Sequence, residues 1–374
     1  MIGIKDKWCA SINGDDIKPD EFKALNIEET SDLGLPTCNF TFHSHDLDKV
    51  RRYTKRGEVI PIGIGDWTMD ILVENEFKVQ NKKIATFQGN DNWSVNLSCI
   101  LNKPDYYHKH RMRTFNTWGD KWRSSDVIAK VWQDVGLIPK VHSSKDKMLW
   151  LQANVSDRRF LEEVVHHAWY GEGKPVAYGI KKNDEAFYQP FETLLSPKFT
   201  IGNMEGVDIP IEGWGIQVND GFASGWMGYD RINPTHRTED GYDIEYNTKV
   251  TPVIAPDAGM YSNEKFAPVR TYNDNVHKEW VKAESQNLQF RASLSANSMM
   301  CTLHGEYKDI SVGDCLDGRW ITTDKIDRPH VEVNGLWIVS KVRHLISEGS
   351  YNLEVFLSRE ALIEDAPYIR YGGR

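Results

Sequence analysis

Two ten-residue segments near opposite ends of the chain share one pattern of side chains. SVNLSCILNK (residues 94–103) aligns without gaps to SYNLEVFLSR (residues 350–359), which lies 256 residues later. One Ser, one Asn and two Leu are identical, and a final Lys matches an Arg. Apolar and polar residues alternate in both segments, as in a strand with one buried face. The same strand is therefore expected twice in this chain.

Two shorter matches precede these segments in the same order. IGIGD (residues 62–66) resembles ISVGD (residues 310–314), and EFKV (residues 76–79) resembles LWIV (residues 336–339). A single match between strands is weak because strands share composition, but three matches in one order favour a duplicated β domain. The repeated positions are Ile62, Gly65, Asp66, Asn96, Leu97, Leu101, Ile310, Gly313, Asp314, Asn352, Leu353 and Leu357.

The repeated residue types have structural interpretations. A Gly before an Asp suits a turn that needs positive φ at the end of a strand. The two Asn residues, Asn96 and Asn352, lie on the face opposite the Leu residues of their strands. Their side chains are expected either to reach a neighbouring strand or to face solvent. We predict a structural role for all twelve positions.

The pattern between the two copies is helical. Apolar residues of 127–135 and 160–168 recur at the spacing of one helical face, and Ser156 is placed to cap the second helix. The sequence predicts an α+β fold, mostly β, with two related β domains, an inserted α/β domain and a second irregular insertion. The expected bounds are 1–105 for the first β domain, 106–195 for the α/β insert, 196–250 with 300–362 for the second β domain, 251–299 for the insertion and 363–374 for a C-terminal tail.

Composition narrows the classes of function. The net charge is −9, which gives no indication of nucleic-acid binding. No apolar run has the length of a membrane span, and the N-terminus has no apolar signal-peptide core. Five Cys without C-x-x-C spacing argue against a disulfide framework or a zinc site. The thirteen Trp and fifteen Tyr fit core and interface packing, with stacking on sugar rings as the alternative.

The sequence offers only weak candidates for catalytic or metal-binding residues. His43 and His45 share one side of a predicted strand and could give two metal ligands, but no further ligands are evident. The acidic pairs Glu162–Glu163 and Asp240–Asp243 are interpreted as solvated charges. Motifs for nucleophilic, phosphate-binding and dinucleotide-binding sites are missing from the sequence. We therefore predict no catalytic residue, no cofactor and no metal, and expect that the protein is not an enzyme.

The layout resembles the central hub proteins of contractile phage tails and the hub portion of type VI secretion spike proteins. The most specific pieces are S-D-x-x-F-L-E-x-V at residues 156–164 and W-I-V-x-x-V-x-H-x-I-x-x-G-S-Y at residues 337–351. The resemblance covers most of the chain and is weakest in residues 1–30 and 200–300. It implies tube-type β-barrel domains and a homotrimer whose six β domains form a pseudo-sixfold ring.

The resemblance also implies partners and a location. The ring would act as a symmetry adaptor between a hexameric tail tube, or its initiator protein, and a trimeric central spike that is a separate polypeptide. Tape-measure and baseplate wedge proteins are further expected partners. The protein would belong to the virion baseplate, act in host cell entry and be assembled in the host cytoplasm, without stable membrane insertion. The alternative hypothesis is a tail-associated carbohydrate-binding or glycan-cleaving protein.

Overall fold

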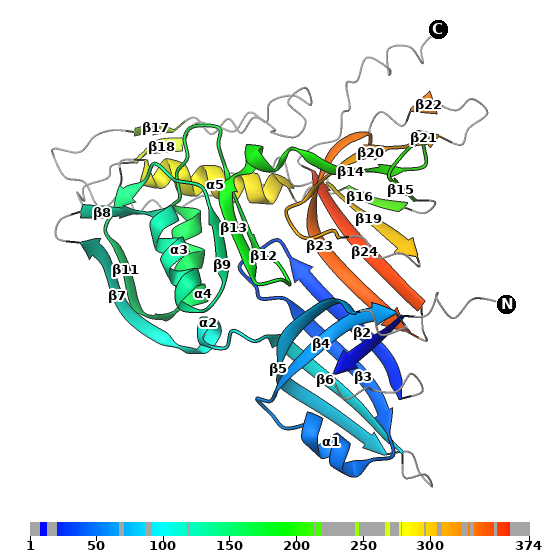
Figure 1. Ribbon diagram of the computed structural model, residues 1–374. Coiled ribbons are helices and arrows are strands. Elements are labelled where there is room, and N and C mark those ends of the chain that lie inside the picture. The colour runs from blue at the N-terminus through cyan, green and yellow to red at the C-terminus, as the bar shows by residue number, and fades with distance from the viewer. Residues whose placement is uncertain are drawn as a thin grey trace.

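The structure is a computed structural model in which two β units lie beside an α/β insert (Figure 1). Within the described residues, no helix has both the length and the apolar character that a bilayer crossing requires. The described residues are 8–12, 21–66, 71–86, 92–117, 120–211, 214–218, 244–246, 266–269, 277, 279–294, 297–304, 309–322, 328–329, 333–347 and 350–359.

The first β unit is an antiparallel sheet with the strand order β1-β4-β5-β6-β3-β2. Burial alternates along β2, β3 and β6, as expected for strands with one face on a core. The short helix α1 (Leu47–Tyr53) begins after Asp46, whose carboxylate accepts bonds from the Asp48 and Lys49 N–H groups. The strands are β1 (Trp8–Ile12), β2 (Phe22–Thr30), β3 (Thr37–Ser44), β4 (Val59–Asp66), β5 (Ile71–Thr86) and β6 (Trp93–Leu101).

The second β unit has the strand order β15-β14-β20-β23-β24-β19-β16. Its β23–β24 hairpin pairs residues 338–347 with residues 350–358. The contacts of β14 with β15 and β20 are parallel, and the other contacts within the unit are antiparallel. The strands are β14 (Pro197–Gly202), β15 (Ile209–Pro210), β16 (Trp214–Val218), β19 (Asn297–His304), β20 (Cys315–Arg319), β23 (Gly335–Ser347) and β24 (Ser350–Arg359).

The two β units have the same topology. The order β4-β5-β6-β3-β2 in the first unit corresponds strand by strand to β20-β23-β24-β19-β16 in the second. Both long hairpins also carry a register shift at the same place. It falls between Val79 and Asn81 in β5 and between Val339 and Lys341 in β23. The shared shift aligns the two hairpins residue by residue.

The insert contains two small sheets, ordered β10-β8-β7-β11 and β12-β13-β9. Its helix α4 is capped by Ser156, whose hydroxyl accepts a bond from the Arg159 N–H, as expected from the sequence. The elements are α2 (Asp105–His108), β7 (His110–Thr117), β8 (Asp120–Arg123), α3 (Ser124–Asp134), β9 (Ile138–Val141), β10 (Lys147–Met148), β11 (Trp150–Ser156), α4 (Asp157–His166), β12 (Val176–Ile180), β13 (Glu185–Pro190) and the 3-10 turn η2 (Phe191–Leu194).

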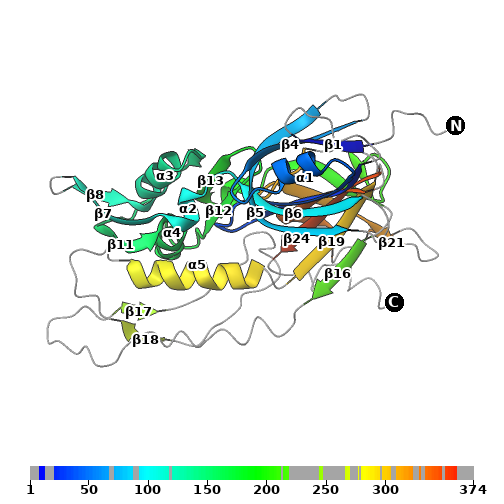
Figure 2. The ribbon, with the colours of Figure 1, turned by 90° about the horizontal axis from the view of Figure 1, so that it is seen from below.

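One long helix, α5 (Trp280–Leu294), packs against α4 of the insert (Figure 2). It lies in the segment 251–299, for which the sequence predicts an irregular insertion. Phe290 of α5 also contacts a small cluster that includes Ile338 of the second β unit. The helix therefore bridges the insert and that unit. The remaining short strands are β17 (Ile244–Tyr246), β18 (Phe266–Val269), β21 (Ile321–Thr322) and β22 (Arg328–Pro329).

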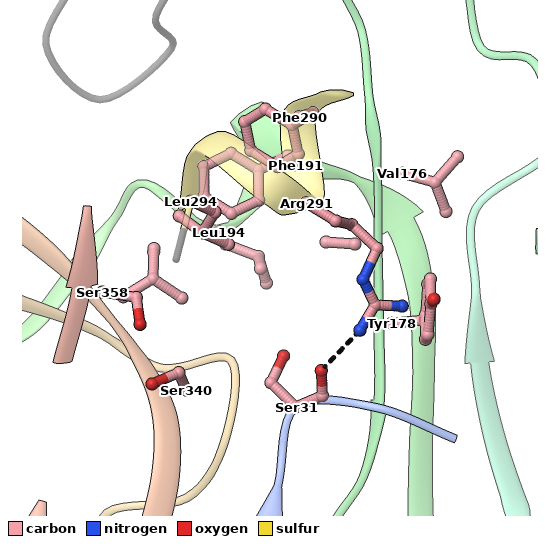
Figure 3. Close-up of a pocket in the computed structure, with 12 residues that line it drawn as sticks. Ser31, Val176, Tyr178, Phe191, Leu194, Phe290, Arg291, Leu294, Ser340 and Ser358 are labelled. Carbon is pink, nitrogen blue, oxygen red and sulfur yellow. Dashed lines mark hydrogen bonds between the residues drawn. The ribbon is translucent and has the colours of Figure 1, made fainter. Parts of the chain in front are cut away.

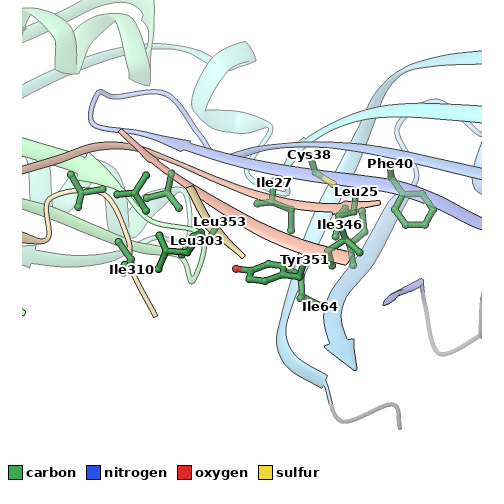
Figure 4. Packing of buried hydrophobic residues seen from close by; sticks show 14 of the residues in the cluster. Leu25, Ile27, Cys38, Phe40, Ile64, Leu303, Ile310, Ile346, Tyr351 and Leu353 are labelled. Carbon is green, nitrogen blue, oxygen red and sulfur yellow. The ribbon is translucent and has the colours of Figure 1, made fainter. Parts of the chain in front are cut away.

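A single hydrophobic core serves both β units. Figure 4 shows Leu25 and Ile27 of the first unit beside Ile346 and Tyr351 of the second. The insert has a separate core around α3 and α4, which includes the fully buried Trp132. The β units are thus joined by apolar packing, and the insert is a second packed body attached to them.

The predicted α+β, mostly β fold class is confirmed. The predicted domain bounds stay predictions, although β6 ends at Leu101 before α2 and β14 begins at Pro197. The predicted tail 363–374 lies outside the described residues, as does most of the predicted insertion 251–299.

Candidate functional site at the strand edges

The two β units join through one antiparallel strand pair, β2 with β23, which we call the seam. Residues 24–30 of β2 lie opposite residues 341–347 of β23, so the units form one continuous sheet. Leu25, Ile27 and Ile346 are buried at the seam. Backbone pairing and apolar burial therefore act together there.

An ion-pair network crosses the seam. A Glu28 carboxylate oxygen lies 2.8 Å from Lys341 Nζ, and the other accepts from Arg343 Nε at 2.6 Å. Burial would raise the pKa of Glu28, but the bonds from Lys341 and Arg343 outweigh it and the pKa is lowered. Arg343 also contacts Glu354 of β24 at 3.4 Å. The network holds β2 in one register on the β23–β24 hairpin.

A buried ion pair joins all three units close to the seam. Glu29 of β2 and Lys182, which follows β12 of the insert, are almost fully buried, and their charged groups lie 3.1 Å apart. Lys182 also donates to Ser311 Oγ at 3.1 Å, and the Val312 N–H points to Glu29 at 3.5 Å. Ser311 and Val312 precede β20 of the second β unit. The pair thus fixes the insert against both β units.

Asp314 makes a second connection between the insert and the second β unit. Its carboxylate lies 3.2 Å from Lys181 Nζ and 3.1 Å from Lys198 Nζ, and it accepts from the Ser311 N–H at 3.0 Å. Burial would lower the pKa of Lys198, but Asp314 and Asp309 outweigh it and raise this pKa. Asp314, one of the repeated positions, therefore acts as an anchor for two lysines.

His344 lies fully buried on β23, where Nδ1 is 2.8 Å from the Tyr351 hydroxyl oxygen. Burial, and then the charge of Lys182, lower the pKa of His344 well below its usual value of 6.5. The side chain is therefore neutral in the fold at neutral pH. In the unfolded chain the same imidazole binds a proton below about pH 6.5.

This difference predicts a loss of stability in acid. The contribution of neutral His344 is complete above pH 6.5 and falls as the pH drops below that value, by about 2 kcal/mol between pH 7.5 and pH 5. His344→Leu is expected to remove this part of the pH dependence, as measured by urea unfolding at both pH values. His142→Gln, at an exposed histidine, is the control. An unchanged pH dependence in His344→Leu would contradict the assignment.

Two glycine turns correspond between the β units. Gly57 and Gly313 both have φ of +82°, and their N–H groups donate to Val79 O and Val339 O at 3.0 and 2.9 Å. The sequence alignment instead matched Gly313 to Gly65, which lies within β4. The hydrogen bonds therefore place the counterpart of the 310–314 turn at residues 54–58.

The two glycine turns have different surroundings, so the same substitution is expected to have different effects in each. A Cβ on Gly57 meets no atom closer than 3.8 Å, whereas a Cβ on Gly313 meets the Phe187 ring at 2.5 Å. We expect Gly57→Ala to cost about 1–2 kcal/mol from left-handed backbone strain, and Gly313→Ala to cost about 1–3 kcal/mol more from overpacking. Chemical unfolding of both variants measures the difference, and equal losses would contradict it.

The closing strands β6 and β24 contain the other repeated positions. Asn96 Nδ2 donates to Thr41 Oγ1 at 2.9 Å, and Asn352 Oδ1 lies 2.7 Å from His304 Nδ1. Both Asn side chains thus reach the residue directly opposite on the neighbouring strand. The repeated apolar positions described are buried in the shared core: Ile62, Leu97, Ile310, Leu353 and Leu357, with Leu101 in the core of the insert.

The strand pairing within each hairpin shows which residues of β6 and β24 correspond. This structural alignment differs from the sequence alignment by two residues. Val79 lies opposite Cys99, and its counterpart Val339 lies opposite Leu357, 258 residues after Cys99. An offset of two keeps every side chain on its own face. The repeated Asn residues therefore lie on the same face of their strands, but at positions that are two residues apart in the structural alignment.

The strands that correspond to the two seam strands, β5 and β16, each have an edge without a partner strand in the described structure. On β23, residues 341–347 pair with β24 on one side and β2 on the other. The described counterpart residues, 81–86 of β5, pair only with β6 and are all exposed, including Ile84 at 41%. The counterpart of β2 is β16, which pairs only with β19 among the described strands. Open edges present unpaired backbone groups to other strands.

The other candidate residues are scattered. His43 lies at the end of β3, and burial followed by the charge of Lys23 lowers its pKa. Within the described part of the chain, no group of three or more His, Cys, Asp or Glu side chains could hold a metal ion. Glu162 pairs with Arg158 and Arg159 on the surface of α4. The proposed pair Asp240–Asp243 lies outside the described residues.

No protein-family model and no curated protein matches the chain, whereas solved structures match it over nearly its whole length. A tail protein from Neisseria meningitidis matches with a TM-score of 0.58 at 10% identity, covering 95% of this chain and 97% of that one. The 43 kDa tail protein of prophage MuSo2 from Shewanella oneidensis matches with a TM-score of 0.54 at 8% identity, over 95% and 97%. The chain has the fold of phage tail proteins.

A component of a secretion system has a similar fold. A type VI secretion component from E. coli, described as structurally similar to the phage T4 tail proteins gp27 and gp5, matches with a TM-score of 0.52 at 7% identity. The match covers 94% of this chain and 76% of that one. The likeness to phage tail and secretion proteins that the sequence predicted is therefore confirmed at the level of the fold.

Proposed function

We propose that the protein is a structural hub subunit of a phage tail baseplate. In this role it forms a homotrimeric ring with pseudo-sixfold symmetry, placed between a hexameric tail tube and a trimeric central spike in the virion. Tape-measure and baseplate wedge proteins are additional proposed neighbours, and assembly takes place in the host cytoplasm. The fold shared with tail proteins supports this proposal. The observation that carries it is that β5 and β16, the counterparts of the seam strands, each have an open edge.

The seam suggests how subunits join. Within one chain, β2 of the first unit pairs with β23 of the second. The corresponding contact would pair β16 of the second unit with β5 of the first unit in the next chain. Repeating both contacts alternately gives a head-to-tail arrangement, which closes into a ring when the rotations add to a full turn. Three chains then supply six β units and six similar contacts.

The proposed contact has a specific register. Glu28 lies opposite Arg343 in the seam. The counterpart of Arg343 in β5 is Lys83, since both lie four residues beyond the corresponding Val79 and Val339. The counterpart of Glu28 in β16 is Gln217, which pairs with Ser298 as Glu28 pairs with Thr37. Position 217 of one subunit is thus expected opposite position 83 of its neighbour.

Disulfide cross-linking tests this register. Cysteines at opposed positions of an antiparallel pair come within the range of a disulfide. The double variant Lys83→Cys with Gln217→Cys is expected to give covalently linked dimers and trimers on oxidation. Native mass spectrometry of the unmodified chain is expected to show three times the mass of one chain. The described native cysteines, Cys38, Cys99, Cys301 and Cys315, are buried and give little background.

A one-residue shift provides the control. Lys82→Cys with Gln217→Cys places the first cysteine on the opposite face of β5, so cross-linking is expected to fail. Equal cross-linking in both variants would contradict the proposed register. A monomer at micromolar concentration that binds neither tube nor spike proteins in co-expression would contradict the hub itself.

The alternative of carbohydrate binding or cleavage receives no support from the tryptophans whose burial the structure describes. The tryptophan side chains whose burial the structure describes are all buried or half-buried: Trp93, Trp122, Trp132, Trp150, Trp169, Trp280, Trp320 and Trp337. Sugar-stacking sites instead need an exposed aromatic face. The described tryptophans therefore favour packing and a structural role.

A further inference from the structure

A pocket of about 150 Å³ lies where α5, the insert and the β23–β24 hairpin meet. Figure 3 shows Arg291 and Tyr178 at one side of it, Ser31 below them, and Ser340 and Ser358 on the strands opposite. The pocket therefore touches all three units, since Ser31 directly follows β2. Its occupant would contact each of them at once.

Arg291 gives the pocket a positive charge. Its guanidinium carbon lies 4.3 Å from the centroid of the Tyr178 ring, and Nη2 donates to Ser31 O at 3.2 Å. Burial lowers the pKa of Arg291, and the more distant charges of Asp32 and Glu162 oppose this effect. A guanidinium has five N–H donors, and no carboxylate among the described residues forms an ion pair with this one. A half-buried cation without a counterion is costly.

The rest of the lining is mostly apolar. Phe290 and Phe191 meet edge to face, with ring centroids 4.5 Å apart, and Leu194 and Leu294 complete that wall. A cavity of about 150 Å³ with similar walls accommodates a benzene-sized group. The pocket thus combines a compact apolar space with one fork-shaped cation.

We propose that this pocket binds a carboxylate that carries a compact apolar group. The carboxylate would accept two parallel bonds from Arg291, the geometry that a guanidinium favours, and the apolar group would lie against Phe290 and Leu294. The carboxylate comes either from a free small acid or from a protein segment. The proposal does not depend on the oligomeric state of the chain.

Benzoate is the probe, with benzyl alcohol as an uncharged analogue of similar size. Isothermal titration of the full chain is expected to show benzoate binding at least about tenfold more tightly than benzyl alcohol. Arg291→Gln is expected to abolish this preference, and Arg291→Lys to restore part of it. Ala177→Leu, which fills the pocket but keeps Arg291, is expected to weaken both probes. Equal binding of the two probes, or an unchanged preference in Arg291→Gln, overturns the proposal.

A second comparison identifies the source of the carboxylate. Residues 360–374 follow Arg359, next to the pocket residue Ser358, and include Glu360, Glu364 and Asp365. Tighter benzoate binding after removal of residues 360–374 would identify this segment as the natural occupant. Displacement of benzoate by an added tube or spike protein would identify a partner's carboxylate. Unchanged affinity in both cases would exclude the C-terminal segment and these partners, and would leave a free small acid as the source.

Discussion

Loss of either partner of the buried Glu29–Lys182 pair is expected to lower the free energy of unfolding by about 3–5 kcal/mol. Lys182→Met leaves the Glu29 carboxylate in a site from which water is excluded, and Glu29→Leu leaves the Lys182 ammonium there without this carboxylate. Urea unfolding followed by circular dichroism measures each loss. The large effect comes from the charge left behind, since desolvation offsets most of the attraction within an intact pair.

The double variant and an exposed pair test this explanation. Glu29→Leu with Lys182→Met removes both charges together and is expected to be much less destabilising than either single change. Lys174 and Glu192 form an ion pair with both side chains more than 40% exposed. Lys174→Met is therefore expected to change stability by less than about 1 kcal/mol. Additive losses in the double variant would show that the two side chains do not act as a pair.

Phe40→Ala is expected to destabilise both β units together, by about 3–5 kcal/mol. Phe40 is fully buried in the core that the two units share. A core substitution in the second unit, Leu353→Ala, is expected to cost about 2–5 kcal/mol in the same unfolding transition. Calorimetry at fixed protein concentration measures both, since subunit association also shifts the midpoint.

Separate behaviour of the units would contradict a shared core. If they unfolded independently, Phe40→Ala would shift one transition and Leu353→Ala another. The insert provides the comparison, because its core is separate. Val131→Ala, on the buried face of α3, is expected to act first on the insert. Hydrogen exchange of β12 and of β24 distinguishes the two cores.

Periodicity predicted the repeated elements well, because strands and amphipathic helices impose spacing on the sequence. The alternation in SYNLEVFLSR predicts β24, and the helical stripes predict α3 and α4. The register between the copies was not predictable in the same way. A shift of two residues keeps every side chain on its face, so a pattern of period two cannot detect it. Only the opposition of Val339 to Leu357 reveals the shift.

The seam and the buried pair depend on residues far apart in the sequence. Nothing local indicates that Glu29 meets Lys182 or that Glu28 meets Arg343. One signal was present in β2, where Leu25, Ile27 and Glu29 share a face, so a carboxylate occupies a position with buried spacing. Such a position predicts a buried partner. The identity of that partner requires the tertiary fold.

The seam between β2 and β23 also determines how a ring of such chains would assemble. Both strands belong to one polypeptide, so their contact forms in a unimolecular step whose rate does not depend on protein concentration. Contacts between chains require diffusional encounter and slow down on dilution. In the proposed hub, half of the contacts around the ring would therefore be complete before any two subunits meet. Only the remaining half would respond to the level of expression in the infected cell.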